Sequence, residues 1–265
     1  MLRPLTIFDA LNVAFRIMQT NMVKFGRIAL IAMLPKIIAY LLLFAHVGND
    51  DLNSIIIISD FFVKAWAACA IIVIVVNYMQ QETDILLRPF TPNAYGLIFR
   101  FAQPVLLIIV LAGCVFGLLS SLLIAIPSGT SILFAVIISA LMCLKFLYWM
   151  LAPVIMIFES HLTLFGGLRK SQYLMTRNRI RYTKGSALAY AVAICFVSIV
   201  GFMGANALAL SMSIWGIGLS FIIEMFIFVW ITCNIAVLYI KQLISVEAFD
   251  LFCKSQVLGD SKPVK

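Results

Sequence analysis

Long apolar runs alternate with short polar segments along the chain. Runs of this kind are long enough to cross about 30 Å of hydrocarbon, because a helix rises about 1.5 Å per residue. We predict six membrane spans, at residues 25–47, 55–80, 104–126, 131–158, 186–210 and 217–240. The pattern therefore predicts an all-α fold: a polytopic membrane helix bundle whose single domain covers residues 1–253.

Shorter amphipathic segments lie on one side of these spans, if the spans alternate in direction. Residues 5–21, 93–102, 161–184 and 242–253 combine apolar and polar positions at helical spacing, which is typical of helices in the membrane interface. The segments before spans one, three and five give a unit that recurs about every eighty residues, from either an internal triplication or shared hydropathy. Residues 254–265 are predicted to form a flexible tail.

The second span permits two interpretations, because two charges interrupt its first half. Asp60 and Lys64 are four residues apart, so they would pair on one face of a continuous helix that starts at Ile55. In the alternative, the helix starts at Phe61 and residues 54–59 form an entry segment. We favour the continuous helix, because it lets the two opposite charges neutralise each other.

Composition indicates a membrane protein. Hydrophobic residues make up 64% of the 265 positions and charged residues 11%, against about half and about a quarter in soluble domains. Of the 19 Lys and Arg residues, all but Lys36, Lys64 and Lys145 fall on the side of the amphipathic segments. Because cytoplasmic loops are rich in Lys and Arg, both termini are expected in the cytoplasm. The net charge of +8 then reflects orientation and attraction to anionic lipid, and nucleic acid is not an expected partner.

The sequence pattern lacks the constellations that enzymes and metal centres use. Most cysteines lie inside apolar runs, where cysteine acts as a small hydrophobe, and the two histidines, His46 and His161, fall on opposite sides. We find no nucleophile and base set and no phosphate-binding glycine loop. We therefore expect no catalysis, no cofactor and no bound metal. Asp9 and Arg16 interrupt the first apolar stretch, so the first span is expected to direct insertion in place of a cleaved signal peptide.

Ionisable residues also fall inside the spans, where an unpaired charge costs a few kcal/mol or more. They are Lys36, Asp60, Lys64, Lys145 and Glu224, and the three lysines are placed near mid-span. One interpretation is a cationic cavity for an anionic head group, a small anion or a relayed proton. The other is a structural set of pairs, Asp60 with Lys64 and Glu224 with Lys36, in which the remaining lysine extends toward the interface.

A basic cluster between spans four and five supplies a second group of candidate residues. Its members are Arg169, Lys170, Arg177, Arg179, Arg181 and Lys184. Each cation near an anionic membrane surface contributes about 1 kcal/mol of attraction, so the cluster is suited to anionic lipid head groups or to a partner protein. A plain topological signal explains the same residues.

Small residues recur every four positions in two spans. They are Gly113, Gly117, Ser121 and Ala125 in span three, and Gly201, Ala205 and Ala209 in span five. Faces of this kind let helix backbones approach closely. We favour packing within the bundle over a dimer interface, because a bundle of this size has many internal contacts to make.

Two stretches of the chain resemble a known family. One is Phe8-Asp9-Ala10-Leu11 followed by Phe15-Arg16, Asn21 and Met33-Leu34-Pro35; the other contains Lys145, Ala152-Pro153, Glu159, Leu168, Ser171 and Leu174. Both are similar to bacterial inner-membrane proteins of the YciC type and to the membrane domain attached to some glycerophosphodiester phosphodiesterases. The chain departs from the family pattern at Gly167, where the family has Ala, and at Arg177-Asn178, where it has Gly.

That resemblance implies a six-span protein of a bacterial inner membrane, with membrane anchoring or envelope lipid homeostasis as its role. No catalytic residue carries over, because the chain has no phosphodiesterase domain. We therefore predict a non-enzymatic integral membrane protein that interacts with lipid, a membrane-protein partner or a second copy of itself through its cytoplasmic-face helices and basic loop. The alternative is a small transporter or carrier that uses the intramembrane lysines and Glu224.

Overall fold

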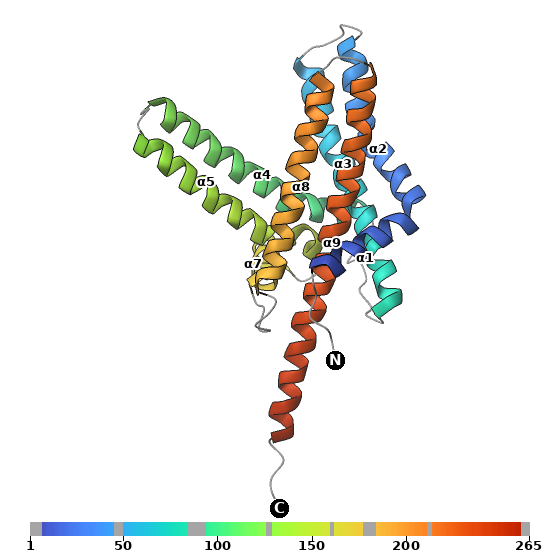
Figure 1. The fold of residues 1–265 in the computed structure, drawn as a ribbon, viewed down its shortest axis with the longest axis vertical. Coiled ribbons are helices and arrows are strands. Elements are labelled where there is room, and N and C mark those ends of the chain that lie inside the picture. Colours follow the sequence, from blue (N-terminus) through green and yellow to red (C-terminus); the bar gives the residue numbers. More distant parts are fainter. Residues whose placement is uncertain are drawn as a thin grey trace, which may run out of the picture.

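The computed structural model describes residues 7–44, 50–83, 94–125, 129–159, 162–176, 184–210 and 214–260. All regular structure in these ranges is helical (Figure 1). In chain order the helices are α1 (Ile7–Thr20), α2 (Met22–Phe44), α3 (Asp50–Thr83), α4 (Ala94–Ala125), α5 (Gly129–Trp149), α6 (Ala152–Phe158), α7 (Leu164–Thr176), α8 (Lys184–Leu210) and α9 (Ile214–Asp260).

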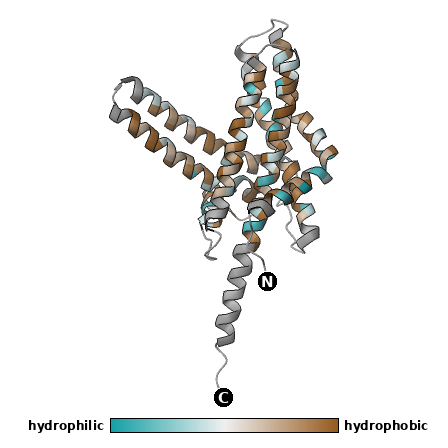
Figure 2. Ribbon diagram, in the orientation of Figure 1, coloured by the Kyte–Doolittle hydropathy of each residue, from teal (hydrophilic) through white to brown (hydrophobic). Residues whose placement is uncertain are grey.

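Within the described residues, 6 helical runs are long and apolar enough to cross a membrane. They are α2, α3, α4, the run of α5 and α6, α8 and α9, and hydrophobic residues predominate along the α4–α5 hairpin in Figure 2. The chain is thus an all-α, multi-pass membrane helix bundle, as its hydropathy pattern predicts. We call the end of the bundle at which α1 and α7 lie the basic end, because it carries Arg16, Lys24, Arg100, Arg169 and Lys170.

The first amphipathic segment is a separate helix, as predicted. Ala10, Ala14 and Ile17 recur at helical spacing along α1 and are buried, whereas Arg16 is exposed. The helix ends before Asn21, whose side-chain Nδ2 donates to the Ile17 carbonyl at 3.2 Å. The chain therefore turns at Asn21, and α2 leaves in a new direction (Figure 1).

Span two is one continuous helix, so the longer of the two interpretations is correct. α3 begins at Asp50 and passes through Asp60 and Lys64 without interruption. These opposite charges lie four residues apart, where helix geometry brings their side chains together. Their mutual neutralisation allows an apolar helix to contain them.

Some predicted helix boundaries are absent. Residues 94–102 and span three as far as Ala125 belong to the single helix α4, which passes through Pro104. Membrane helices tolerate an internal proline where neighbouring groups satisfy the backbone carbonyl that it frees, so Pro104 does not start a new helix. Span six and residues 242–253 are likewise one helix, α9, which includes the first part of the predicted tail and ends at Asp260. Residues 261–265 lie outside the described part of the chain.

Span four is predicted as one helix, but the structure divides it into two. α5 ends at Trp149, the chain turns at Met150 and Leu151, and α6 follows. Pro153 lies in the first turn of α6, where a backbone N–H has no partner within the helix, so proline loses no hydrogen bond there. In the middle of a longer helix, its ring would clash with the preceding turn. The 21 residues of α5 already extend about 30 Å. α6 is therefore not needed to cross the membrane, and residues 152–157 are all buried.

The core lies where α1, α3, α6 and α9 meet. Its fully buried side chains include Ile17, Ile71, Ile155 and Tyr239, one from each of these helices. By contrast, α4 and α5 form a hairpin that slants away from the other spans (Figure 1). Among the large apolar side chains that are described in this hairpin, Leu119 is buried and the others are exposed or partly exposed, as contact with lipid tails requires.

The two faces of small residues differ in their packing. Gly201 of α8 lies so close to α9 that an added Cβ would overlap the Ile227 side chain, and Ala205 is fully buried. Packing within the bundle is therefore confirmed for span five. Gly113 and Gly117 of α4 have no atom within 4 Å of an added Cβ, so the same prediction is wrong for span three.

Candidate functional site

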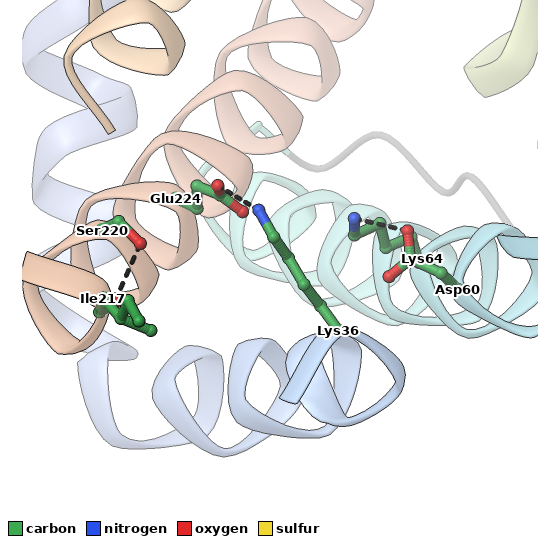
Figure 3. A network of polar contacts seen from close by, with 6 residues as sticks. All are labelled: Lys36, Asp60, Lys64, Ile217, Ser220 and Glu224. Carbon is green, nitrogen blue, oxygen red and sulfur yellow. Dashed lines mark hydrogen bonds and ion pairs between the residues drawn. The ribbon is translucent and has the colours of Figure 1, made fainter. Parts of the chain in front are cut away.

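Charged residues from α2, α3 and α9 lie near one another inside the membrane region, and we call them the mid-span network (Figure 3). Lys36 of α2 forms an ion pair with Glu224 of α9, and its Nζ lies 5.9 Å from the centre of the Phe221 ring. Lys64 of α3 donates to the Asp60 carboxylate at 2.6 Å. Both pairings that the sequence predicts are therefore present.

Helix geometry explains why these charges share one depth. Asp60 and Glu224 each lie 10 residues after the first residue of their helix, about 15 Å along its axis from the end opposite the basic end. The Glu224 side chain is only 5% exposed, whereas Asp60 and Lys64 are 26% and 32% exposed. With two positive and two negative groups the network is neutral, which is typical of structural pairs.

Lys145 lies near the end of α5, although it is at the middle of the apolar run Ile132–Phe158 that also includes α6. α5 ends at Trp149, so Lys145 is four residues, about 6 Å, from the end of its helix. Its Nζ donates to Oε1 of Gln172 in α7 at 3.0 Å and lies 5.4 Å from the centre of the Trp149 ring. The sequence did not locate this helix end, because the predicted span continues through Pro153.

A polar surface forms around this lysine, and we name Lys145, Trp149, Arg169 and Gln172 the Lys145 cluster. Arg169 is exposed and lies three residues before Gln172, on the same face of α7. None of the carboxylates whose side chains the structure describes, Asp60, Glu159 and Glu224, forms an ion pair with Lys145 or Arg169. Lysine and tryptophan are typical of the membrane interface, where their apolar parts lie in hydrocarbon and their polar groups reach the head groups. The cluster is therefore suited to a phosphate or a carboxylate.

A second polar cluster at the basic end is internal to the bundle. Lys170 forms an ion pair with the Glu159 carboxylate at 2.7 Å, and the Tyr239 hydroxyl donates to the same carboxylate at 3.3 Å. Arg100 donates to the backbone carbonyl of Glu159 at 3.3 Å. These contacts connect α4, α7 and α9 to the end of α6. Lys170 therefore holds the helices together, whereas its neighbour Arg169 faces outward.

α7 also stabilises the break between α5 and α6. The buried hydroxyl of Ser171 donates to the Tyr148 carbonyl at 2.6 Å and accepts from the Leu151 N–H at 3.2 Å. A broken helix leaves backbone groups of this kind without partners in the helix. Gly167 permits the close approach, because an added Cβ would lie 2.8 Å from the Met156 sulfur.

The predicted basic cluster is only partly within the described residues. Arg169 and Lys170 have the different roles given above, and Lys184 is the first residue of α8. Arg177, Arg179 and Arg181 lie outside the described residues. Among the residues that are described, no three His, Cys, Asp or Glu side chains come together in a way that could hold a metal ion.

The chain matches no family model, no curated protein and no solved structure. The YciC-type resemblance therefore stays a prediction. The residues of its second stretch nevertheless act together in this fold: Lys145 contacts α7, Pro153 begins α6, Glu159 joins the helices, and Ser171 caps the break. That stretch thus corresponds to one physical unit, made of α5, α6 and α7.

Sequence reasoning missed the neutral polar residues that connect helices. Gln172 accepts from Lys145, and Tyr190 of α8 donates to the buried side chain of Asn234 in α9. One signal was available, because a polar group inside an apolar run needs a partner. The sequence gives no means of naming that partner, since Tyr190 and Asn234 are 44 residues apart.

Proposed function

We propose that this chain is a non-enzymatic integral protein of a bacterial inner membrane that binds anionic phospholipid head groups at the Lys145 cluster. The observation that carries the proposal is a pair of cations, Lys145 and Arg169, that form no ion pair with the carboxylates whose side chains the structure describes, Asp60, Glu159 and Glu224. The cations of the mid-span network pair with its carboxylates, whereas Lys145 and Arg169 are available to an external anion.

The geometry of the cluster supports a head-group site. Gln172 uses Oε1 to hold the Lys145 ammonium, which leaves its Nε2 as a further donor beside the two cations. Trp149 lies under the ammonium and fixes the lysine stem near the end of α5. Arg169 adds a planar donor group, which is suited to two phosphate oxygens at once.

A transporter role has less support. It requires charged side chains that line a path for an ion or a solute, and the mid-span charges form pairs between α2 and α9 and within α3. We keep this role as the second candidate because Lys36 and Lys64 retain partial exposure, 25% and 32% of their side chains. Transport of a counter-ion in reconstituted vesicles that is lost in Glu224→Gln would support it.

Native mass spectrometry of the detergent-purified chain tests the head-group site. Dioleoyl phosphatidylglycerol and dioleoyl phosphatidylcholine are titrated separately, and the ratio of their affinities is measured. A cation that contacts the bound head group is worth about 1 kcal/mol, so Lys145→Met or Arg169→Gln should lower the preference for the anionic lipid about fivefold. Lys24→Met, an exposed lysine at the same end, is the matched control and should leave the ratio near that of the wild type. Equal ratios in all variants would refute the proposal.

A further inference from the structure

A cavity of about 390 Å³ lies between α1, the first half of α2, and α9. This volume falls in the range of about 300–1,000 Å³ that is common for ligand sites. Its walls include Phe15 of α1, Gly26 and Ala29 of α2, and Phe226 and Val229 of α9. The cavity is separate from the Lys145 cluster, which is built from α5 and α7.

The course of the chain accounts for this space. At Asn21 the chain turns from α1 into α2, and α2 then returns to α9, where Lys36 pairs with Glu224 and the Tyr40 and Phe221 rings meet edge to face at 5.5 Å. Figure 1 shows the resulting corner between α1 and α2. Below the level of the Lys36–Glu224 pair the side chains do not fill this corner. Gly26 contributes to the space, because an added Cβ would meet no atom within 4 Å.

The cavity is apolar except at one side. Gln19 of α1 is its one polar lining residue, and Arg16 lies three residues earlier on the same helix. Arg16 is exposed, and it forms no ion pair with Asp60, Glu159 or Glu224, the carboxylates whose side chains the structure describes. Apolar walls next to an amide and a cation, at the level of an interfacial helix, complement a molecule with an apolar tail and an anionic head.

We infer that this cavity binds one acyl chain of an anionic phospholipid from the leaflet at the basic end, with the lipid phosphate beside Gln19 and Arg16. The inference depends on the proposed function in one respect only, which is that anionic lipid is present at this interface. The charge complementarity of Arg16 selects the head group, and the apolar walls hold the chain. The lipid then occupies the corner where α1 joins the spans and stabilises the position of α1 against α9.

Leucine substitution of two glycines tests the tail site. Gly26→Leu places a side chain in the cavity, whereas Gly218→Leu, the matched control in α9, adds the same group where an added Cβ also meets no atom within 4 Å and no cavity wall is touched. Native mass spectrometry with dioleoyl phosphatidylglycerol measures the lipid retained per chain. We expect Gly26→Leu to reduce the retention of one lipid at least fivefold and Gly218→Leu to leave it unchanged. Equal retention in the two variants overturns the inference.

Arg16→Gln tests the head-group part on the surface of α1, where the substitution leaves the fold intact. In the Lys145→Met background, this variant should retain the acyl chain but lower the remaining preference for phosphatidylglycerol over phosphatidylcholine about fivefold, whereas an unchanged preference overturns the assignment of Arg16. A polypeptide bound in place of lipid and lost in Gly26→Leu also overturns the inference. Lys145→Met should not affect this lipid, so failure of the cavity site and failure of the Lys145 site are distinguishable.

Discussion

Replacing Lys36 with methionine should be one of the most destabilising single changes in the membrane region. The substitution keeps an unbranched side chain of similar length in α2 and removes the cation that pairs with Glu224. The Glu224 side chain is 5% exposed, so its charge cannot reach water by a change of rotamer. Removing one partner of a buried ion pair costs about 3–5 kcal/mol, and we expect about 3 kcal/mol here, because Lys36 is partly exposed.

Removing the charge of the other partner, Glu224, should destabilise the protein less than removing that of Lys36, so the two substitutions have distinguishable effects. In Glu224→Gln the unpaired group is Lys36, whose long stem allows the ammonium to move toward a polar region and whose contact with Phe221 remains. We expect a loss of about 1–2 kcal/mol for Glu224→Gln. The double variant Lys36→Met, Glu224→Gln should lie within about 1 kcal/mol of the wild type, because it leaves no unpaired charge.

Reversible unfolding in mixed micelles of dodecyl maltoside and SDS measures these free energies, and the four proteins form a double-mutant cycle. The cycle should give a coupling energy of about 2 kcal/mol or more between the two residues. Additive losses, or a larger loss for Glu224→Gln than for Lys36→Met, would show that the pair does not stabilise the bundle in the way described.

Three further predictions concern the stability of the same protein in detergent. Lys64→Met should cost about 1 kcal/mol or less, because its pair with Asp60 is local and partly exposed; a loss as large as that of Lys36→Met contradicts this. Gly167→Ala should lower the free energy of unfolding by about 1–2 kcal/mol, because its Cβ would approach the Met156 sulfur. The control Gly166→Ala should be neutral or stabilising. Equal effects of the two substitutions in a melting experiment would contradict the close contact. Ser171→Ala should cost about 1–3 kcal/mol by leaving the Tyr148 and Leu151 backbone groups unsatisfied, and its control Thr176→Ala should change stability by less than about 0.5 kcal/mol in the same unfolding assay.

The sequence predicts the class of fold well, because span length and hydropathy act locally. It also predicts both pairs of the mid-span network: Asp60 and Lys64 are four residues apart on one helix, and Lys36 and Glu224 are the opposite charges that remain at similar depth. The helix boundaries are predicted less well. Pro104 lies within a continuous helix, whereas Pro153 begins a new one.

The difference between the two prolines depends on tertiary structure. Ser171, which is 20 residues beyond Leu151 in sequence, satisfies the backbone at the break that precedes Pro153. The same dependence hid the Lys145 cluster, because the position of Lys145 near a helix end follows from the break. A hydropathy pattern contains no information about which distant hydroxyl or amide satisfies a given backbone group.

The cap that Ser171 provides has a consequence for the biogenesis of the protein. The hydroxyl that satisfies Tyr148 and Leu151 is synthesised after the segment that it caps. We therefore expect the cap to form only after α7 has been synthesised, and α6 to reach its buried position after α5 has entered the bilayer.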